Sequence, residues 1–386
     1  MSYKDSIKSE IIPTFDGKNL LITGVTGACG QVFLEKLLRV FTNIGTIFVL
    51  IRPKFNLTPQ QRFERLLKSN LFKFHEYEES QLKKVKILEG DVTENELGLS
   101  ASDAQLLRES VNFVFHIAAS ISFAASFSSN FKSNAIGTEN LMLFAKTIKK
   151  IECIIYTSTA YSNCHLKEIP EEIVPLKEEI DVLMTKFKTM KGEELENEAI
   201  KYFEGRPNNY TFTKALAEHI VVKLHGNIPT AIVRPAVVAS AYEEPYPGFV
   251  DTLVGPVGLA VLVGLGIVQI INFDLSKHLE FTSVDVLTNA TLAITTETSK
   301  TKPTEAKVYN IVSSTLNHLP ENYNVWTYSY NLYIKTPSIY TLRPLMNPKR
   351  VNNHNPTIYH IKRFFYHTVF AVIIDIFLIL FCQKRM

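Results

Sequence analysis

A tyrosine and a lysine stand four residues apart, at Tyr210 and Lys214, within the segment Pro207–Glu218. On a helix, side chains with this spacing project from the same face, so a phenol and an ammonium would share one site. The ammonium would favour the phenolate and lower the pKa of the tyrosine, which suits a general acid. Solvated helix faces carry the same spacing by chance. A second motif near the N-terminus favours a catalytic role for the pair.

That second motif is a glycine-rich turn. Gly24, Gly27 and Gly30 recur every third residue, after a strand-like segment at 19–24 and before a helix-like segment at 31–39. The backbone amides of such a turn and the N-terminus of the next helix attract the diphosphate of a dinucleotide. The spacing differs from G-x-G-x-x-G, but the position between strand and helix is the same. The expected cofactor contacts are Thr23, Gly24, Thr26, Gly27, Ala28, Cys29 and Gly30.

Two basic residues indicate which dinucleotide the turn would bind. Arg52 and Lys54 follow the second apolar segment, residues 46–51, where this kind of fold reads the adenosine ribose. An acidic residue there would bind the free 2′-hydroxyl of NADH, whereas cations suit the 2′-phosphate of NADPH. A solvated basic corner is the alternative interpretation. The sequence therefore favours NADPH as the cofactor.

Further cofactor contacts are expected where later strands end. Asp91 and Val92 follow the third strand, near the expected position of the adenine. Ala118 and Ala119 follow the fourth, where small side chains let the backbone approach the cofactor. Asn134 opens the next helix, and we expect it to orient a water molecule or a backbone carbonyl near Lys214.

Hydroxyl groups end the fifth strand, in Thr157-Ser158-Thr159-Ala160. Ligands of such sheets bind at the carboxyl ends of the strands. A hydroxyl there would hydrogen-bond a substrate carbonyl beside Tyr210. Thr159 is the first choice for this catalytic role and Ser158 the second. Serine and threonine are also ordinary residues at the end of a strand.

The alternation of apolar segments with helical ones predicts an α/β fold with a doubly wound parallel sheet. An acidic, helix-forming insertion at 168–204 separates the fifth strand from Tyr210, and we expect it over the substrate side. A glycine-punctuated apolar run at 255–271 is expected to form a lid or pocket wall. The six expected strands are 19–24, 46–51, 85–89, 111–117, 153–157 and 231–234.

The charge is distributed unevenly along the chain. From Asn331 onward there are eight Lys or Arg residues against Asp375 alone, a balance of +7, which leaves 33 basic and 37 acidic residues before it, a balance of −4. Because the basic tail flanks an apolar run, it favours an anionic membrane surface over nucleic acid as the partner. A solvated basic tail is the alternative.

The cysteines and the N-terminus indicate a reducing, cytosol-facing location. The four cysteines are scattered without a Cys-x-x-Cys or histidine pattern, so neither a disulfide framework nor a metal site is indicated. Residues 1–5 run into charged residues without an apolar core, so no secretory signal is expected.

An apolar segment lies near the C-terminus. Residues 364–381 just reach the length for a membrane span and contain His367 and Asp375. A mid-bilayer aspartate costs roughly 2.5–3.5 kcal/mol, which the aliphatic and aromatic residues outweigh. A buried helix of an appended domain is the alternative. We expect an NADP-binding reductase domain at 12–318 and a partial, helical, membrane-associated domain at 319–386.

Together the glycine turn, Thr-Ser-Thr-Ala and Tyr-x-x-x-Lys resemble those of an extended short-chain dehydrogenase/reductase. Longer stretches narrow the resemblance to the fatty acyl-CoA reductase family, over roughly residues 12–318. The C-terminal region resembles only the beginning of that family's C-terminal domain, as if truncated. The stretches are Leu50–Lys54, Ser158–Cys164, Pro207–Val221, Ile232–Pro235, Glu244–Asp251 and Gly255–Pro256.

This resemblance implies NADPH-dependent reduction of long-chain acyl-CoA to a fatty alcohol with release of CoA. Tyr210 and Thr159 would stabilise and protonate the oxyanion, and Lys214 would hold the nicotinamide ribose. Arg234 and Pro235 would add cofactor contacts. The resemblance also implies a membrane-associated enzyme of the endoplasmic reticulum or peroxisome, with membrane lipid as a partner.

Two other functions stay open from the sequence. A membrane-bound sterol or steroid dehydrogenase of the same superfamily would oxidise a ring hydroxyl with NAD, against which Arg52 and Lys54 argue. A catalytically inactive, lipid-binding scaffold would keep the fold without the chemistry, against which intact Thr159, Tyr210 and Lys214 argue.

Overall fold

The computed structural model describes residues 10–253, 255–270, 272, 280–313, 325–344 and 356–380. The chain divides into two compact units, Met1–Val250 with Phe281–Val312, and Asp251–Glu280 with Ser313–Met386. The expected boundary after residue 318 lies outside the described residues. The structure differs from the expected division in grouping 251–280 with the C-terminal region.

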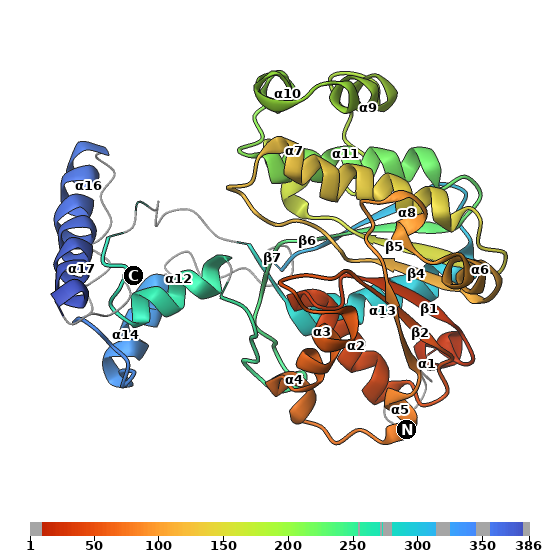
Figure 1. Ribbon diagram of the computed structural model, residues 1–386, viewed down its shortest axis with the longest axis horizontal. Coiled ribbons are helices and arrows are strands. Elements are labelled where there is room, and N and C mark those ends of the chain that lie inside the picture. The colour runs from red at the N-terminus through yellow and green to blue at the C-terminus, as the bar shows by residue number, and fades with distance from the viewer. Residues whose placement is uncertain are drawn as a thin grey trace. The chain divides into compact units, whose positions relative to one another are not determined.

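The first unit is built on a seven-stranded parallel sheet in the order β3-β2-β1-β4-β5-β6-β9 (Figure 1). All six strands expected from apolar runs are confirmed. A seventh, β9, was not expected, because the edge segment Lys307–Ile311 alternates polar and apolar residues instead of forming an apolar run. The strands are β1 (Leu20–Thr23), β2 (Ile47–Ile51), β3 (Val85–Glu89), β4 (Phe113–His116), β5 (Cys153–Thr157), β6 (Thr230–Pro235) and β9 (Lys307–Ile311), with β7 (Val237–Ala239) and β8 (Phe281–Ser283) paired separately.

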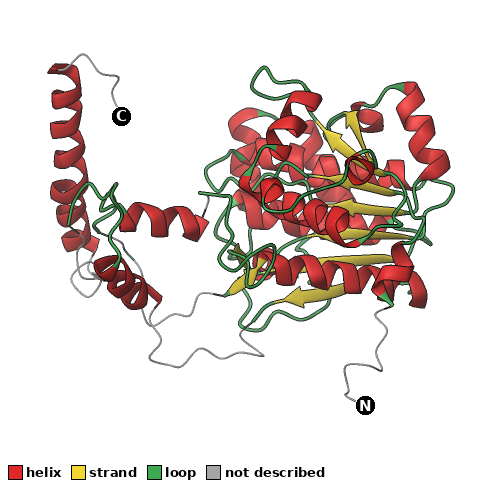
Figure 2. Ribbon diagram, turned by 90° about the horizontal axis from the view of Figure 1, so that it is seen from below, coloured by secondary structure: helices red, strands yellow, loops and turns green. Residues whose placement is uncertain are grey.

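Helices cover both faces of the sheet (Figures 1 and 2). Alternate residues of each strand enter two separate apolar cores, as in β1, where Leu20 and Ile22 face one core and Leu21 faces the other. The first core packs against α2 (Ala28–Val40), α3 (Pro59–Leu67), α4 (Asn70–Lys73) and α13 (Val284–Thr301). The second packs against η2 (Asn95–Gly98), α6 (Ala101–Ser110), α8 (Gly137–Ala145) and α11 (Asn209–Leu224).

The strand order reverses between β1 and β4, because the chain continues from β1 to β2 and β3 on one side and from β4 to β5 and β6 on the other. In open parallel sheets, ligands bind at the carboxyl ends of the strands beside such a reversal. The expected fold class is therefore confirmed, and the reversal locates the site.

The acidic insertion forms α9 (Ile180–Thr189) and α10 (Gly192–Ile200). Its aromatic core, built around Phe127, Phe187 and Phe212, joins these helices to α7 (Phe127–Asn130) and α11. The insertion therefore forms an outer layer on α7 and α11 (Figure 1). The insertion's apolar side chains pack against aromatic residues of these helices, and its position over the substrate side stays a prediction.

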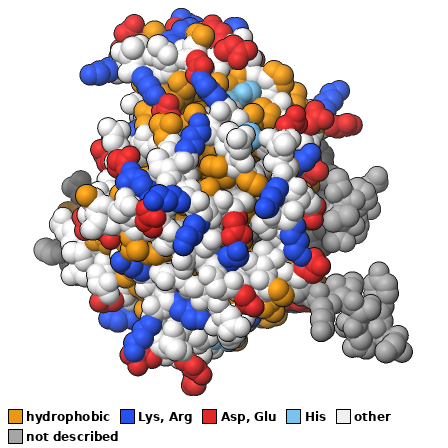
Figure 3. All heavy atoms as spheres, turned by 90° about the vertical axis from the view of Figure 1, so that its right-hand side faces the viewer, with side chains coloured by type: hydrophobic (Ala, Val, Ile, Leu, Met, Phe, Trp, Pro, Cys, Tyr) orange, Lys and Arg blue, Asp and Glu red, His pale blue; other side chains and the backbone are white. Residues whose placement is uncertain are grey.

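The remaining short helices of the first unit connect these layers. They are α1 (Ile11–Phe15), α5 (Glu79–Leu82), the π-helical η3 (Phe131–Ile136) and the 3-10 helix η4 (Ala160–Asn163). On the face drawn in Figure 3, basic and acidic side chains of the described residues are interspersed.

The second unit is helical in its described residues. Tyr333 donates a hydrogen bond to the Ala260 carbonyl at 2.9 Å, which joins α14 to α12. His367 Nε2 accepts the backbone N–H of Gln269 at 3.0 Å. The helices are α12 (Gly255–Gly264), α14 (Val325–Lys335), α16 (Pro356–Arg363), η5 (Phe364–Val369) and α17 (Phe370–Leu380).

The expected apolar segment at 364–381 is helical through Leu380, and Phe381 lies outside the described residues. Thr357–Leu380 forms a helix of 24 residues, and its most apolar part has a mean hydropathy of 1.9. No residue of that part is buried by the described chain. At 1.5 Å per residue the helix is about 36 Å long, enough to cross the hydrocarbon core of a bilayer, which is about 30 Å thick.

Candidate active site

The glycine turn is compact because two of its glycines touch other backbone segments. Gly24 has φ +85°, and a Cβ there would lie 2.6 Å from the amide nitrogen of Ala118. A Cβ on Gly30 would lie 2.3 Å from the Gly24 carbonyl oxygen. At Gly27, which caps α2, a Cβ would meet only that oxygen, at 3.3 Å, so the space beyond is open. The helix has no side-chain cap, so this position fits a diphosphate.

The turn lies beside α11, which carries Tyr210. Cys29, in the first turn of α2, is close enough to Tyr210 for the two side chains to interact electrostatically. Burial raises the pKa of the Cys29 thiol to about 11, so the thiol stays protonated at neutral pH. Thr23 packs beneath the turn, where its hydroxyl contacts His116 Nδ1 at 2.8 Å and accepts the Ala118 N–H at 3.2 Å.

Helix α11 presents Tyr210 and Lys214 at the carboxyl ends of the strands. Asn208 caps the helix by accepting the Thr211 N–H at 3.0 Å. The Lys214 side chain is buried, donates to the Thr157 carbonyl at 2.7 Å and lies 4.3 Å from the centre of the Tyr156 ring. Burial lowers the pKa of Lys214 to about 7, which its neighbour Glu218 partly opposes.

Tyr210 and Thr159 lie close enough for the Thr159 side chain to influence the pKa of the phenol. The Thr159 hydroxyl itself accepts the Tyr161 N–H at 3.2 Å and lies 3.4 Å from the Pro235 carbonyl. The expectation that Lys214 lowers the pKa of Tyr210 is wrong. Burial raises the pKa of the phenol above its usual range, and the neighbouring Thr159 only partly opposes the shift. Desolvation dominates, because Lys214 directs its ammonium to the Thr157 carbonyl.

Two expected contact residues instead belong to a buried polar network one turn further along α11. Ser158 donates to Glu218, and Arg234, which is fully buried, forms a salt bridge to the same carboxylate at 2.7 Å. Arg234 also donates to the carbonyls of Pro170 and Glu172, both at 2.9 Å. The network ties β5, β6 and α11 together. Pro235 is buried beside it, and its carbonyl lies 3.4 Å from Thr159 Oγ1.

Sequence reasoning missed Glu218, although a signal was present. Tyr210, Lys214 and Glu218 are spaced by four residues each, which predicts that all three lie on one helix face.

Asn134 lies in η3, buried, and binds a loop instead of facing Lys214. Its side chain accepts the Ser120 N–H at 2.7 Å and donates to the Ser120 carbonyl at 3.1 Å and to Thr213 at 3.1 Å. The nearby His116 is also buried, and desolvation together with Lys214 lowers its pKa to about 3, so it is neutral.

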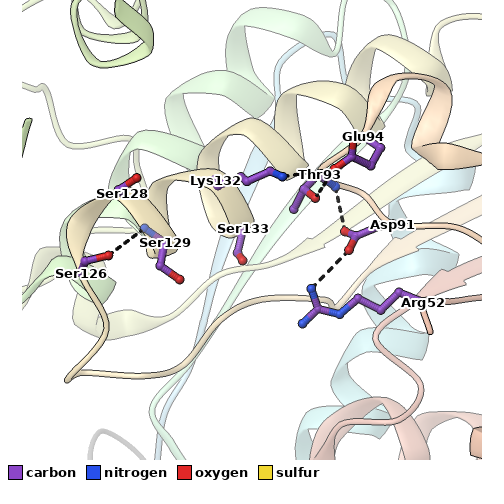
Figure 4. A pocket seen from close by; sticks show the side chains of 9 residues that line it. All are labelled: Arg52, Asp91, Thr93, Glu94, Ser126, Ser128, Ser129, Lys132 and Ser133. Atoms are coloured by element: carbon purple, nitrogen blue, oxygen red, sulfur yellow. Dashed lines mark hydrogen bonds and ion pairs between the residues drawn. The ribbon is translucent and has the colours of Figure 1, made fainter. Parts of the chain in front are cut away.

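A cavity of about 410 Å³ lies beside the ends of β2 and β3 (Figure 4). Arg52 forms an ion pair with Asp91 at 3.2 Å across one side of it. Burial disfavours the charged form of Asp91, but the Thr93 N–H and the Arg52 guanidinium outweigh this and lower its pKa. Its lining residues are Arg52, Asp91, Thr93, Glu94, Ser126, Ser128, Ser129, Lys132 and Ser133.

A second arginine, missed from the sequence, connects this corner to the glycine turn. Arg62 of α3 donates to Thr26 Oγ1 at 2.8 Å and to the Arg52 carbonyl at 2.6 Å. Burial and the charge of Arg52 lower the pKa of Arg62. Lys54 is exposed and holds its ammonium 4.7 Å from the centre of the Phe55 ring.

The other expected contacts lie on the same edge of the sheet. Val92 is buried against Gly137, where an added Cβ would lie 2.9 Å from its Cγ2. Ala118 touches Gly24, and Ala119 is exposed beside it. In the described part of the chain, no group of three or more His, Cys, Asp and Glu side chains is placed to hold a metal ion.

A parallel sheet of this order, a glycine turn after β1 and a helix with Tyr-x-x-x-Lys define an extended short-chain dehydrogenase/reductase. The reductase domain of a nonribosomal peptide synthetase from Mycobacterium tuberculosis shares the fold, with a TM-score of 0.60 and 16% identity over 94% of this chain and 80% of that one.

Sequence comparison gives the family. Residues 22–291 match the profile of the family described as male sterility protein. Fatty acyl-CoA reductase 2 of Mus musculus is 35% identical over 80% of this chain and 60% of its own length. Fatty acyl-CoA reductase 1 of Rattus norvegicus is 32% identical over 96% of this chain and 71% of its own length. The chain belongs to the fatty acyl-CoA reductase family, and it spans about 60% of the mouse relative.

The buried ion pair predicts a non-additive effect on stability. Arg234→Met or Glu218→Met leaves one charge buried without its partner, so each should lower the free energy of unfolding by about 3–5 kcal/mol. The double variant removes both charges and should lose much less than the sum. Urea unfolding of the four proteins measures this coupling, and additive losses would contradict a direct pairing.

Lys214 predicts a pH dependence of stability. Its pKa is about 7 in the folded chain and about 10.4 in the unfolded chain. Between these pH values the unfolded chain binds a proton that the folded chain has lost. The free energy of unfolding therefore rises as the pH rises from about 7 to about 10.4, and it falls as the pH returns to about 7. In urea unfolding, wild type should gain up to about 5 kcal/mol relative to Lys214→Met across this window. Parallel pH profiles would contradict the buried amine.

Proposed function

We propose that this chain is an NADPH-dependent fatty acyl-CoA reductase that converts long-chain acyl-CoA to a fatty alcohol and releases CoA. One observation carries the proposal. Tyr210 on α11 and Thr159 at the end of β5 lie near each other at the carboxyl edge of the sheet, beside Cys29 of the glycine turn, in a chain of the fatty acyl-CoA reductase family.

The residues of the site suit reduction of a thioester carbonyl. Bound NADPH would supply hydride to the carbonyl carbon. Tyr210 and Thr159 would donate hydrogen bonds to the oxyanion that develops. The raised pKa of Tyr210 keeps the phenol protonated and able to donate. Lys214, with a pKa of about 7, holds or releases a proton near neutral pH and lies one turn along the helix.

The second reduction would use the same groups. Collapse of the hemithioacetal expels the CoA thiolate, and a proton from the site completes the thiol. The aldehyde carbonyl then takes the position of the thioester carbonyl, and a second equivalent of NADPH is required. Tyr210 would protonate the alkoxide to give the alcohol.

The cofactor preference rests on the two arginines at the end of β2. Arg52 and Arg62 lie next to each other, and Arg62 also touches Thr26 of the glycine turn. Neighbouring guanidinium groups that repel each other favour a bound dianion, and the 2′-phosphate of NADPH supplies one. Lys54 would add a third cation at this corner.

The apolar helix supports a membrane location. Thr357–Leu380 has the length and hydropathy of a bilayer span, and Lys362 and Arg363 lie within its first turns. Long-chain acyl-CoA and fatty alcohol both partition into lipid, so membrane lipid would be a partner of this enzyme. We place the site on the cytosolic side, at the endoplasmic reticulum or the peroxisome, because the scattered cysteines suit a reducing compartment.

Activity tests the proposal directly. Membranes containing the chain, given NADPH and palmitoyl-CoA, should produce hexadecanol that gas chromatography with mass spectrometry detects. Tyr210→Phe removes the proton donor and should lower the rate by about 10²–10⁴-fold. Tyr340→Phe, at an exposed tyrosine of the second unit, is the matched control with unchanged rate. Neither alcohol nor aldehyde from palmitoyl-, stearoyl- and oleoyl-CoA would exclude the activity, and a phenotype indifferent to Tyr210→Phe would favour a scaffold.

Cofactor selectivity is tested by calorimetry. Arg52→Ala and Arg62→Ala each remove a charge-assisted contact worth about 1.5–3 kcal/mol, so the Kd for NADPH should rise by about 10- to 150-fold. The Kd for NADH should change by less than about threefold, because NADH has no 2′-phosphate. Arg65→Ala, exposed on the same helix, is the control. Equal losses for the two cofactors would contradict a 2′-phosphate site.

A further inference from the structure

The loop between β4 and α7, residues 117–126, exposes apolar side chains beside the catalytic tyrosine. Ile121 is 54% exposed and Phe123 is 66% exposed. Between His116 and Lys132 the sequence contains no Asp, Glu, Lys or Arg. A surface loop of this length without charge is unusual, because loops in contact with water are normally rich in polar and charged residues.

Three asparagine side chains hold the backbone of this loop. Asn134 binds both the N–H and the carbonyl of Ser120. Asn130, which is fully buried, donates to the Ser122 carbonyl at 3.0 Å and accepts from the Ser120 hydroxyl at 2.7 Å. Asn209, next to Tyr210 in the sequence, donates to the Ala125 carbonyl at 2.9 Å. These hydrogen bonds fix the backbone around Ile121 and Phe123, so the fold itself holds the two apolar side chains in their exposed positions.

The apolar surface continues into the proposed catalytic site. The centre of the Phe123 ring lies 5.6 Å from the centre of the Tyr210 ring, with an angle of 44° between their planes. At the other end of the loop, Ala118 touches Gly24 of the nucleotide turn. A ligand whose carbonyl meets the Tyr210 hydroxyl would therefore extend its neighbouring atoms over Phe123 and Ile121.

We infer that the loop 117–126 is a wall of the acyl subsite, on which Phe123 and Ile121 contact the first methylene groups of a long alkyl chain bound through its carbonyl at Tyr210. This inference rests on the proposed function and identifies the part of the chain that selects the substrate. The occupant is an alkyl chain because the surface offers methyl and phenyl groups and no charge, and because a flexible alkyl chain loses contact with water when it lies along them.

The test measures binding as well as turnover. Thioether analogues of acyl-CoA with chains of 4 and 16 carbons cannot be reduced, and calorimetry gives their Kd for wild type and for the double variant Ile121→Ser/Phe123→Ser. Initial rates with butyryl- and palmitoyl-CoA, and the KM for NADPH, are measured on the same proteins in detergent. The conservative double variant Ile121→Val/Phe123→Leu and the exposed control Ile200→Ser, 60% exposed on α10, complete the set.

For the serine double variant we expect the Kd of the 16-carbon analogue and the kcat/KM for palmitoyl-CoA to worsen by about tenfold or more, the equivalent of about two methylene groups returned to water. The 4-carbon compounds should lose less, since a short chain covers less of the loop. The KM for NADPH should stay unchanged. The conservative variant should recover most of the binding, and Ile200→Ser should behave as wild type.

The possible outcomes separate this inference from the proposed function. If wild type turns over and the serine double variant binds and reduces long-chain substrates as well as wild type does, the inferred acyl subsite is wrong and the proposed function is unaffected. If wild type shows no turnover, but the serine double variant binds the 16-carbon analogue more weakly than wild type does, the inferred acyl subsite is supported and the proposed reductase function is excluded. If the serine double variant raises the KM for NADPH and leaves long-chain binding unchanged, the inference is wrong and the loop contributes to the nicotinamide site instead.

Discussion

The burial of a lysine amine is the constraint on which the site depends. Lys214 lies between the end of β5 and α11, where its ammonium donates to the Thr157 carbonyl and lies over the Tyr156 ring. A single buried cation is costly, and the fold offsets that cost with Glu218 one turn further on. Glu218 in turn is neutralised by Arg234. Lys214 and Glu218 of α11 and Arg234 of β6 thus form a series of charges of alternating sign that leads from the candidate site into the interior, and β5 supplies the Thr157 carbonyl and the Ser158 hydroxyl that bind its members.

The sheet could be predicted because parallel strands buried on both faces are short apolar runs, and six such runs are visible in the sequence. The edge strand β9 was missed for the same reason, since Lys307 and Asn310 interrupt its pattern. The acidic, helix-forming composition of 168–204 also predicted helices there, which are α9 and α10, but composition does not show what covers a helix. Their partners are aromatic residues of α7 and α11 that lie far away in the sequence.

The candidate site was predictable where spacing within one element is decisive, as for Tyr210 and Lys214, or where a strand end fixes a position, as for Thr159. Arg62 was missed because its partners Thr26 and Arg52 come from other elements. Glu218 was missed although its spacing from Lys214 was visible, and only its buried pairing with Arg234 required the structure. The direction of the Tyr210 pKa was also wrong, because helical spacing gives the distance between two charges but contains no information on desolvation. Arg234 was singled out by its motif as a cofactor contact. The structure shows that it is buried and pairs with Glu218, so it supports the site from within the core.

The asparagine-held loop between β4 and α7 has a consequence for how substrate range can change during evolution. Its backbone is fixed by side chains from η3, α7 and α11, and its first residues are pressed against the nucleotide turn through Ala118 and Gly24. The side chains at 121–124 point into solvent and contribute little to the cores. Under the inference above, substitutions at these four positions would change the chain-length preference without disturbing either apolar core. They would define a small library for directed evolution of this scaffold.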